Sequence, residues 1–323
     1  MRTLKAPVCL ALLAVLACPL PVLAQKYPGK SIRLVVGYQT GVSYILALLL
    51  SDKLRESIGQ PVVPDFRTGA GGNIAPEVVA KTPPDGYTLL LASSTIVVSP
   101  SLFTKLGYDT FRDFAPITLL ATVPNVMVVH PSVPAKSLAE LVKLAKAHPG
   151  KLNFGSGGVG SGSHLGSELL KTLTKVNMVH VPYKGAAIAM TAMLSGEVDM
   201  VTSTVPATIP LVNSGKIRAL AVMATERVAT LPKVPTAAEA GMPELVVITW
   251  WGLLAPVGTK PDIIERLNAE AVKLMNAPET KSKLAQVGLD AKTSTSAEFT
   301  KFVRAEYEKW RRVIKEANIR VQQ

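Results

Sequence analysis

Short apolar runs alternate with longer amphipathic stretches along most of the chain. Residues 32–36 form a short apolar run, residues 44–58 carry apolar positions at helical spacing, and residues 61–66 return to a strand-like pattern. Short runs of apolar and β-branched residues predict strands, whereas apolar positions three and four apart predict a helix. This alternation predicts an α/β protein with a mainly parallel sheet.

Several helix ends can be predicted from capping residues. Ser43 is a candidate N-cap for the first helix, and Gly59 follows its predicted end. Two capping boxes, Ser137-x-x-Glu140 and Thr295-x-x-Glu298, each open an amphipathic stretch. Such a box predicts a helix start because each side chain accepts from a backbone N–H that the helix leaves unpaired.

Two apolar segments are candidates for strands that cross between domains. They cover residues 117–129, interrupted by Pro124-Asn125, and residues 217–225. Between them lies a block with its own strand and helix alternation, and there is no low-complexity linker. We therefore predict a discontinuous first domain over 25–123 and 225–323 and a second domain over 124–224, with the two strands acting as a hinge.

The first 24 residues have the pattern of a secretory signal peptide. Arg2 and Lys5 supply positive charge, residues 8–18 are uninterruptedly apolar, and Ala24 ends a stretch of small residues suited to cleavage. The apolar run is well short of the roughly 20 residues that span a bilayer, so a membrane anchor is the less favoured interpretation. A lipoprotein acylated at Cys18 is a further alternative. The mature chain is expected to be soluble and exported.

The cysteine positions and the net charge limit which kinds of site the mature chain can have. Both cysteines, Cys9 and Cys18, lie in the predicted signal, so the mature chain has no thiol for disulfides, catalysis or metal binding. The formal charge of +12 falls to +10 once Arg2 and Lys5 are removed, because 33 basic residues then face 23 acidic ones. The lysines are scattered, which predicts a solvated surface rather than a nucleic-acid site, and the net charge favours small anions.

A glycine-rich loop over residues 155–165 has the spacing of a dinucleotide fingerprint, since Gly155, Gly157 and Gly160 satisfy G-x-G-x-x-G. That fingerprint also needs an acidic residue about 20 positions later, and the predicted strand over 177–181 is followed only by Pro182-Tyr183-Lys184. We therefore predict no nucleotide cofactor. A helix start with hydroxyls from Ser156, Ser161 and Ser163 suits a small carboxylate or phosphate, and a ligand-free turn is the alternative.

Other loops of small or hydroxyl residues follow predicted strands. They cover residues 37–43, 69–73, 93–95 and 203–204. Open α/β sheets bind ligands at the carboxyl ends of their strands. Each loop is a weak signal, and their repetition favours one shared binding site.

Catalytic and metal sites are not predicted. The four histidines, at 130, 148, 164 and 180, lack metal-ligand spacing, and no G-x-S-x-G motif occurs. Ser163 and His164 are neighbours whose side chains point apart on a helix, and a lone histidine there is more often packed or hydrogen-bonded. An exported enzyme using one of these two residues is the contrasting hypothesis. Trp250-Trp251 is interpreted as core or domain interface.

Several segments, taken in order, resemble the extracytoplasmic solute receptors of the tripartite tricarboxylate transporter group, often called the Bug family. They are Tyr27-Pro-Gly-Lys-Ser-Ile-Arg-Leu-Val-Val, Gly69-Ala-Gly-Gly-Asn-Ile, Pro84-Asp-Gly-Tyr-Thr-Leu-Leu, Asp113-Phe-Ala-Pro-Ile, His180-Val-Pro-Tyr-Lys-Gly and Trp251-Gly-Leu-Leu-Ala-Pro-Val-Gly-Thr. The resemblance implies a periplasmic binding protein-like fold of type II, with two α/β domains joined by two crossing strands. It also implies a monomeric, non-enzymatic periplasmic receptor that closes on a small carboxylate and delivers it to membrane transporter subunits.

The resemblance further implies which residues bind the ligand. The first domain would contribute Tyr38, Gln39, Gly41, Val42, Ser43, Tyr44, Gly72, Asn73, Ser93 and Ser94, and the second Ser156, Gly160, Ser161, Ser163, His164, Tyr183, Lys184, Gly185 and Ser203. The family's first loop commonly reads Pro-Phe-x-Pro-Gly-Gly-Ser-x-Asp, whereas this chain has Val42 at the second glycine and lacks the aspartate. A Cβ at Val42 and the bulk of Tyr44 narrow the approach to a ligand, so a receptor with altered or lost binding is the alternative.

Overall fold

Ten strands form one mixed sheet in the computed structural model, which describes residues 27–39 and 41–319. The predicted signal peptide and Cys18 lie outside the described residues. The main path of the sheet runs β2-β1-β3-β9-β4-β7-β5-β6, and β8 and β10 also pair with β4. The strands are β1 (Ile32–Val36), β2 (Val62–Phe66), β3 (Thr88–Ser93), β4 (Phe114–Val129), β5 (Asn153–Ser156), β6 (Val179–Pro182), β7 (Met200–Thr204), β8 (Arg218–Val222), β9 (Ile248–Pro256) and β10 (Asp290–Ala291).

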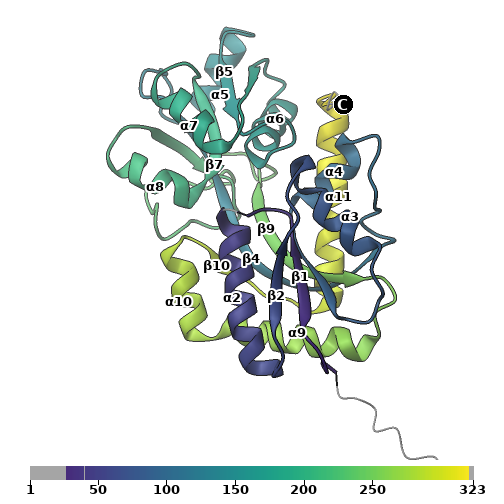
Figure 1. The fold of residues 1–323 in the computed structure, drawn as a ribbon. Helices are drawn as coiled ribbons and strands as arrows, with labels where there is room; N and C mark the ends of the chain where they lie inside the picture. The colour runs from purple at the N-terminus through teal and green to yellow at the C-terminus, as the bar shows by residue number, and fades with distance from the viewer. Residues whose placement is uncertain (1–26, 40, 320–323) are drawn as a thin grey trace, which may run out of the picture.

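Helices connect most of these strands and cover both faces of the sheet (Figure 1). They are α2 (Gly41–Ile58), the short 3₁₀ helix η2 (Ala70–Gly72), α3 (Ile74–Ala80), α4 (Thr95–Leu102), α5 (Leu138–Ala147), α6 (Gly162–Thr174), α7 (Ala186–Leu194), α8 (Val205–Asn213), α9 (Pro261–Asn276), α10 (Pro278–Gln286) and α11 (Ser296–Glu316). Across the described part of the chain, none of them combines the length and apolar character needed to cross a bilayer.

The long strand β4 belongs to two differently built halves of the sheet. Its residues 114–124 pair with β9, whereas residues 125–129 pair with β7. We call the half with β1, β2, β3 and β9 the first lobe and the half with β5, β6, β7 and β8 the second lobe. Figure 1 shows the second lobe above the first. The sequence suggested an interruption at Pro124-Asn125, but the strand continues through these residues. They mark the point where its neighbouring strand changes from β9 to β7.

The second predicted crossing segment, residues 217–225, does not span the two lobes as one strand. It contains β8, which pairs only with the second-lobe part of β4. The chain returns to the first lobe near Val247, where Val247 donates to the Met223 carbonyl and Asn125 donates to the Val247 carbonyl. The crossing thus lies at the start of β9. The domain boundaries predicted from the sequence remain a prediction.

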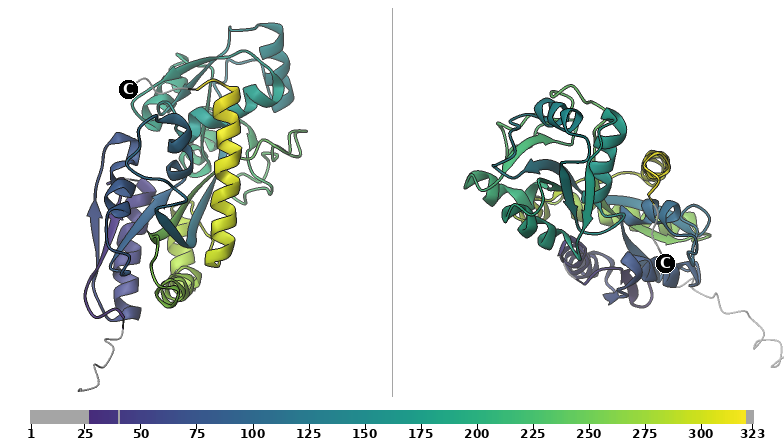
Figure 2. Two further views of the ribbon diagram at one scale, coloured as in Figure 1. Left: turned by 90° about the vertical axis from the view of Figure 1, so that its right-hand side faces the viewer. Right: turned by 90° about the horizontal axis from the view of Figure 1, so that it is seen from above.

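Helix α11 lies lengthwise along both lobes, as the left view of Figure 2 shows. It contacts α4 of the first lobe and α6 of the second, and one apolar cluster runs beneath it through both. Trp250 is fully buried in that cluster and meets Phe299 edge-on, so its interpretation as a core residue is confirmed. The capping box at Thr295 and Glu298 is present as predicted.

The first helix differs from its prediction at its start. It begins at Gly41, so Ser43 lies inside the helix and is not its N-cap. The Ser43 hydroxyl instead accepts a hydrogen bond of 2.9 Å from Nε1 of the buried Trp251. The sheet also differs from the mainly parallel prediction, because β9 pairs antiparallel with both β3 and β4. Both differences arise from contacts between residues far apart in sequence.

Candidate functional site

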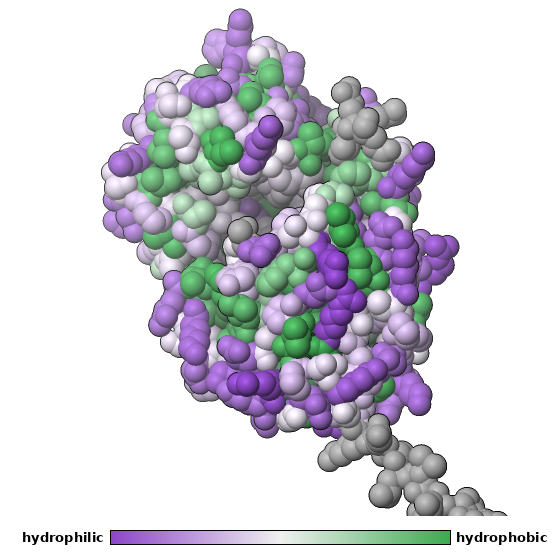
Figure 3. Space-filling view, viewed as in Figure 1, coloured by the Kyte–Doolittle hydropathy of each residue, from purple (hydrophilic) through white to green (hydrophobic). Residues whose placement is uncertain are grey.

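A cavity of about 400 Å³ opens in the second lobe, next to the crossing strands. Figure 3 shows the surface hollowed between the two lobes. None of the side chains that line the cavity carries a charge. The lining residues are Asn125, Ser161, Gly162, Ser163, Ala186, Ala187, Met190, Thr202, Ser203, Thr204, Ala207 and Thr249.

Three helices direct their N-terminal ends toward this cavity. Lining residues include the first residues of α6 and α7 and the first turn of α8. Neither α7 nor α8 is capped by a side chain. The residue before α7 is Gly185, which has none, and the Thr204 side chain makes no hydrogen bond to α8. The first N–H groups of a helix lack intrahelical partners, and the helix dipole adds partial positive charge. The cavity can therefore bind a small anion without any cationic side chain.

Ser203 adds a hydroxyl that the fold leaves free. Ser203 is only 7% exposed and lines the cavity, and its hydroxyl makes no hydrogen bond to the described residues. Its Oγ is open to the cavity rather than sealed in the core, so it can bond to water or to a ligand. Nearby, Asn125 Nδ2 donates to the Val247 carbonyl and to the Thr249 hydroxyl, which holds that amide in place at the crossing.

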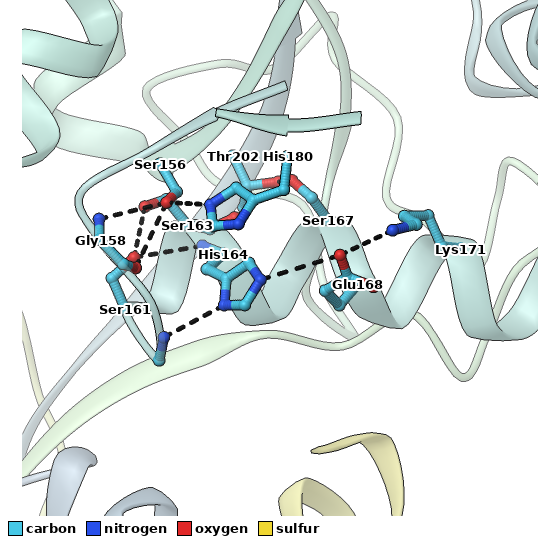
Figure 4. A network of polar contacts seen from close by, with 11 residues as sticks. Ser156, Gly158, Ser161, Ser163, His164, Ser167, Glu168, Lys171, His180 and Thr202 are labelled. Atoms are coloured by element: carbon cyan, nitrogen blue, oxygen red, sulfur yellow. Dashed lines mark hydrogen bonds and ion pairs between the residues drawn. The ribbon is translucent and has the colours of Figure 1, made fainter. Parts of the chain in front are cut away.

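The glycine-rich loop before α6 is held by its own serines (Figure 4). Gly157 N–H donates to Ser163 Oγ at 2.9 Å, and Gly158 N–H donates to Ser156 Oγ at 3.1 Å. Ser161 is the N-cap of α6 and accepts from the His164 backbone N–H. These bonds occupy the N–H groups of Gly157 and Gly158, and the cavity wall here is formed by Ser161, Gly162 and Ser163.

Gly157 also brings two loops together. A Cβ on this residue would lie 2.8 Å from the backbone nitrogen of Ala186, the first residue of α7. Only glycine allows the loop before α6 to approach the start of α7 so closely. The glycine at position 157 of the motif therefore lets the starts of α6 and α7 lie close together.

Two histidines stack beneath the loop. The His164 and His180 ring centroids lie 3.9 Å apart, and the Phe154 ring lies nearly parallel to both, with its centroid 4.9 Å from His180 and 6.3 Å from His164. Burial, and secondarily the neighbouring His180 and Lys171, lower the pKa of His164 to about 3. Burial and Lys171 lower the pKa of His180 to about 4. Both rings are therefore neutral at neutral pH, and the prediction that His164 is packed and hydrogen-bonded is confirmed.

Two serine–histidine side-chain contacts are present among the described residues, and neither suits catalysis in the cavity. Ser132 Oγ lies 2.6 Å from His130 Nδ1, but both residues lie outside the cavity lining. Ser156 Oγ lies 2.6 Å from His180 Nε2. Ser156 is fully buried, so no substrate can reach its hydroxyl. Ser163 and His164 form no hydrogen bond to one another among the described contacts, and His164 Nδ1 accepts from Gly160. No nucleophile–base pair faces the cavity.

Three of the predicted first-lobe residues line a second, much smaller hollow. Tyr38, Gly72 and Ser93 line a space of about 10 Å³ at the ends of β1 and β3. The Tyr38 hydroxyl donates to the Gly71 carbonyl, and Ser93 Oγ lies 2.8 Å from Thr95 Oγ1. Asn73 uses both ends of its amide, accepting from Tyr108 and donating to the Ala70 carbonyl. The polar groups of this hollow are bonded to the protein itself.

The remaining predicted residues lie outside the cavity lining. Gln39 is exposed, Val42 packs against the first-lobe core, and Tyr44 stacks on Phe66 with centroids 5.6 Å apart. The other predicted residues lie at helix ends, in a loop or on the surface. Gly41 begins α2, Ser94 precedes α4 and Gly185 precedes α7, whereas Gly160 lies in the loop before α6 and Lys184 is exposed.

Tyr183 is bonded away from the cavity. Its hydroxyl donates to Glu197 Oε1, and burial together with this carboxylate raises its pKa to about 12.

Of the predicted set, the cavity brings together Ser161, Ser163 and Ser203. Sequence reasoning did not select Asn125 and Thr249, which line the cavity from the crossing strands, or the small residues at the starts of α7 and α8. Asn125 carried a weak signal, since Pro124-Asn125 interrupts an otherwise largely apolar segment. Within residues 27–39 and 41–319, no group of three or more histidine, cysteine or carboxylate residues is arranged to hold a metal.

Comparisons with known proteins agree with this architecture. The family described as "Tripartite tricarboxylate transporter family receptor" matches residues 46–319. A "UPF0065 protein in tcbD-tcbE intergenic region" of Pseudomonas sp. (strain P51) is 38% identical over 92% of this chain and 89% of its own. Protein BugT of Bordetella pertussis (strain Tohama I) is 35% identical over 93% of each chain.

Solved structures show the same fold. R. palustris Rpa4515 with adipate has a TM-score of 0.78 and 35% identity, covering 91% of this chain and 100% of its own. MatC from Rhodopseudomonas palustris with bound malate has a TM-score of 0.75 and 31% identity, covering 89% and 100%. The predicted two-domain α/β fold of a periplasmic binding protein is confirmed. The chain belongs to the tripartite tricarboxylate transporter family of receptors, the group that includes the Bug proteins.

Proposed function

We propose that this chain is a periplasmic receptor that binds one small carboxylate in the second-lobe cavity and delivers it to a tripartite tricarboxylate-type membrane transporter. One observation carries the proposal: the N-terminal ends of α6, α7 and α8 and the free hydroxyl of Ser203 meet in a single uncharged cavity. Backbone N–H groups and hydroxyls at helix starts are suited to a carboxylate. Related receptors were solved with adipate and with malate, which supports this ligand class.

The position of the cavity supports binding by closure. Asn125 and Thr249 line it from the two strands that join the lobes, so a ligand there touches the hinge directly. A ligand that contacts both lobes favours the closed arrangement by its difference in affinity for the two states. The enzyme hypothesis has less support, because Ser156 is buried and Ser163 is bonded to the loop.

The test is a ligand screen on the mature chain. We expect small carboxylates to raise its melting temperature, because a ligand that binds only the folded state stabilises it by mass action. Ser203→Ala should weaken binding about tenfold, since a hydrogen bond to a charged group contributes roughly 1.5–3 kcal/mol. The matched control is Ser214→Ala, an exposed serine just beyond the opposite end of α8.

Two outcomes would contradict the proposal. If no carboxylate shifts the melting temperature at millimolar concentration, the chain is a receptor that has lost or altered its binding. If a bound carboxylate is chemically converted during incubation, the chain is an enzyme. Delivery is tested separately, by asking whether uptake of the bound carboxylate by whole cells stops when the gene for this chain is deleted.

A further inference from the structure

The two lobes offer very different surroundings to a ligand, and the difference bears on which carboxylates fit. This inference rests on the proposed function. The second-lobe cavity provides donors for one anionic group at the starts of α6, α7 and α8. Each helix start carries the equivalent of roughly half a positive charge. The rest of the lining includes the apolar side chains of Ala186, Ala187, Met190 and Ala207, which suit a hydrocarbon body.

The hollow of the first lobe is filled by Tyr38. Its volume of about 10 Å³ leaves room for about one water molecule at most. The Tyr38 ring lies directly over Gly72: a Cβ added to that glycine would lie 2.6 Å from the Tyr38 hydroxyl. Burial raises the pKa of Tyr38, so its hydroxyl stays protonated and donates to the Gly71 carbonyl. No second carboxylate can enter this hollow while the ring is in place.

The groups beneath Tyr38 are those that a second carboxylate would need. Ser93 and Thr95 bring two hydroxyls to the hollow, and Thr95 is the first residue of α4. In the structure these hydroxyls bond to one another at 2.8 Å. The first lobe therefore has a polar pocket of the right composition, and Tyr38 covers it.

The exposed face at the start of α2, in the first lobe, is apolar. Trp251 holds Ser43 in the first turn of α2, and Trp251 lies on the same face of β9 as the cavity residue Thr249, about 7 Å along the strand. From this start of α2, Tyr44, Ile45 and Leu48 project with 39, 37 and 40% of their surfaces exposed. A ligand that extends from the cavity toward α2 meets side chains that cannot pair with a charge.

We propose that the cleft selects carboxylates with a single anionic group and an apolar remainder, and that Tyr38 determines this specificity by covering the polar pocket of the first lobe. The second-lobe cavity binds the carboxylate, and the hydrocarbon or aromatic body lies against Met190 and the start of α2. A ligand with a second carboxylate would have to leave that charge unpaired on an apolar surface, which is unfavourable.

Matched pairs of acids test the selectivity. The mature chain is titrated calorimetrically at pH 7.5 with butyrate and succinate, hexanoate and adipate, and benzoate and terephthalate. The members of each pair differ only in the second carboxylate. We expect the monocarboxylate to bind at least tenfold more tightly in every pair that binds. Equal or tighter binding of a dicarboxylate would overturn this inference and leave the proposed function intact, whereas no binding by any acid would remove both.

A pair of variants tests the role of Tyr38. Tyr38→Ala uncovers Ser93 and Thr95, so the preference for monocarboxylates should fall to threefold or less. Tyr38→Phe keeps the ring and loses only the bond to Gly71, so the preference should stay at tenfold or more. If Tyr38→Ala lowers the melting temperature too far for titration, Tyr38→Leu uncovers part of the pocket with less loss of packing. An unchanged preference in a folded Ala or Leu variant would refute the assignment to Tyr38.

Discussion

The two lobes are built from the same local pattern, yet they use it differently. In each, a strand ends in a loop of small and hydroxyl residues and a helix follows. In the first lobe the polar groups are bonded internally: Tyr38 to Gly71, Tyr108 to Asn73 and Ser93 to Thr95. In the second lobe the starts of α7 and α8 are uncapped by side chains, and Ser203 faces the cavity without a partner among the described residues.

This contrast shows that a loop of small residues is a binding site only when the fold leaves its donors unpaired. Even within the second lobe, Ser156 and Ser163 hold the loop, whereas Ser203 and Thr204 line the cavity with hydroxyls that make no hydrogen bond to the described residues. A hydroxyl that the protein leaves unpaired at a cavity wall can bond to a ligand, whereas a hydroxyl already bonded to the protein must first break that bond. The contrast between a closed first lobe and an open second lobe can be tested by substitutions in each lobe.

The largest effect should come from filling the second-lobe cavity, as Tyr38 fills the first-lobe hollow. Ala187 is exposed at the start of α7 and lines the cavity, so Ala187→Trp should place a ring there and abolish carboxylate binding in calorimetry. The control is Thr191→Trp, an exposed position one turn further along α7 that does not line the cavity. Undiminished binding by Ala187→Trp, or equal loss in the control, would place the site elsewhere.

A second test uses acid, which acts on the second lobe through its two stacked histidines. In the unfolded chain both histidines bind protons below about pH 6.5, whereas in the folded chain their pKa values are about 3 and about 4. Between about pH 4 and pH 6.5 the unfolded chain therefore binds more protons than the folded chain. The free energy of unfolding falls as the pH decreases through this range. Each ring should lower the free energy of unfolding by about 2 kcal/mol between pH 7.5 and pH 5.

Urea unfolding at a series of pH values measures this dependence. His180→Gln keeps a polar partner for Ser156 but does not titrate, so it should remove about half of the histidine contribution to the slope. His148→Gln, at an exposed histidine, is the matched control and should leave the slope as in the parent. A slope that His180→Gln does not change would show that the stacked pair is not responsible.

The smallest effect is expected from the first lobe. Tyr108→Phe removes the hydroxyl that donates to Asn73 at 2.7 Å, which should lower the free energy of unfolding by about 1 kcal/mol. Carboxylate affinity should stay within twofold of the parent, because this bond belongs to the scaffold. Ser203→Ala is the reciprocal case, with weakened binding and little change in stability. A fivefold or larger loss of affinity in Tyr108→Phe would mean that the first-lobe loop contacts the ligand.

Local signals predicted much of the fold. The apolar run at Ile32–Val36 became β1 with the predicted bounds, and Thr295 with Glu298 caps α11 as expected. The start of α2 was misplaced because Ser43 has the right residue type for an N-cap, yet its hydroxyl is held by Trp251, more than two hundred residues away. The path of the chain between the lobes depends on similar long-range contacts, since the pairing of Asn125, Met223 and Val247 joins three distant segments.

For the candidate site, the sequence predicted the glycine-rich loop and the serines, and it disfavoured a nucleotide because the acidic partner was missing. It did not select Asn125 or Thr249, because a polar residue within an apolar strand gives no sign of which side of the sheet it will face. It also treated Ser156, Ser161, Ser163 and Ser203 alike. Their different roles depend on His180, Gly157 and the crossing strands, which only the folded chain brings together.

The sequence by itself determined the strand and helix order, the capping of α11, the glycines that allow close approach, and membership of a receptor family. These features depend on residues near one another in the chain or on motifs in a fixed order. The tertiary structure alone decided which donors remain unpaired, because each hydroxyl and N–H bonds to whatever distant group the fold places beside it. Tyr38 covering Ser93 and the three helix starts around Ser203 are both results of that long-range pairing, which closes the hollow of the first lobe and leaves the cavity of the second lobe open.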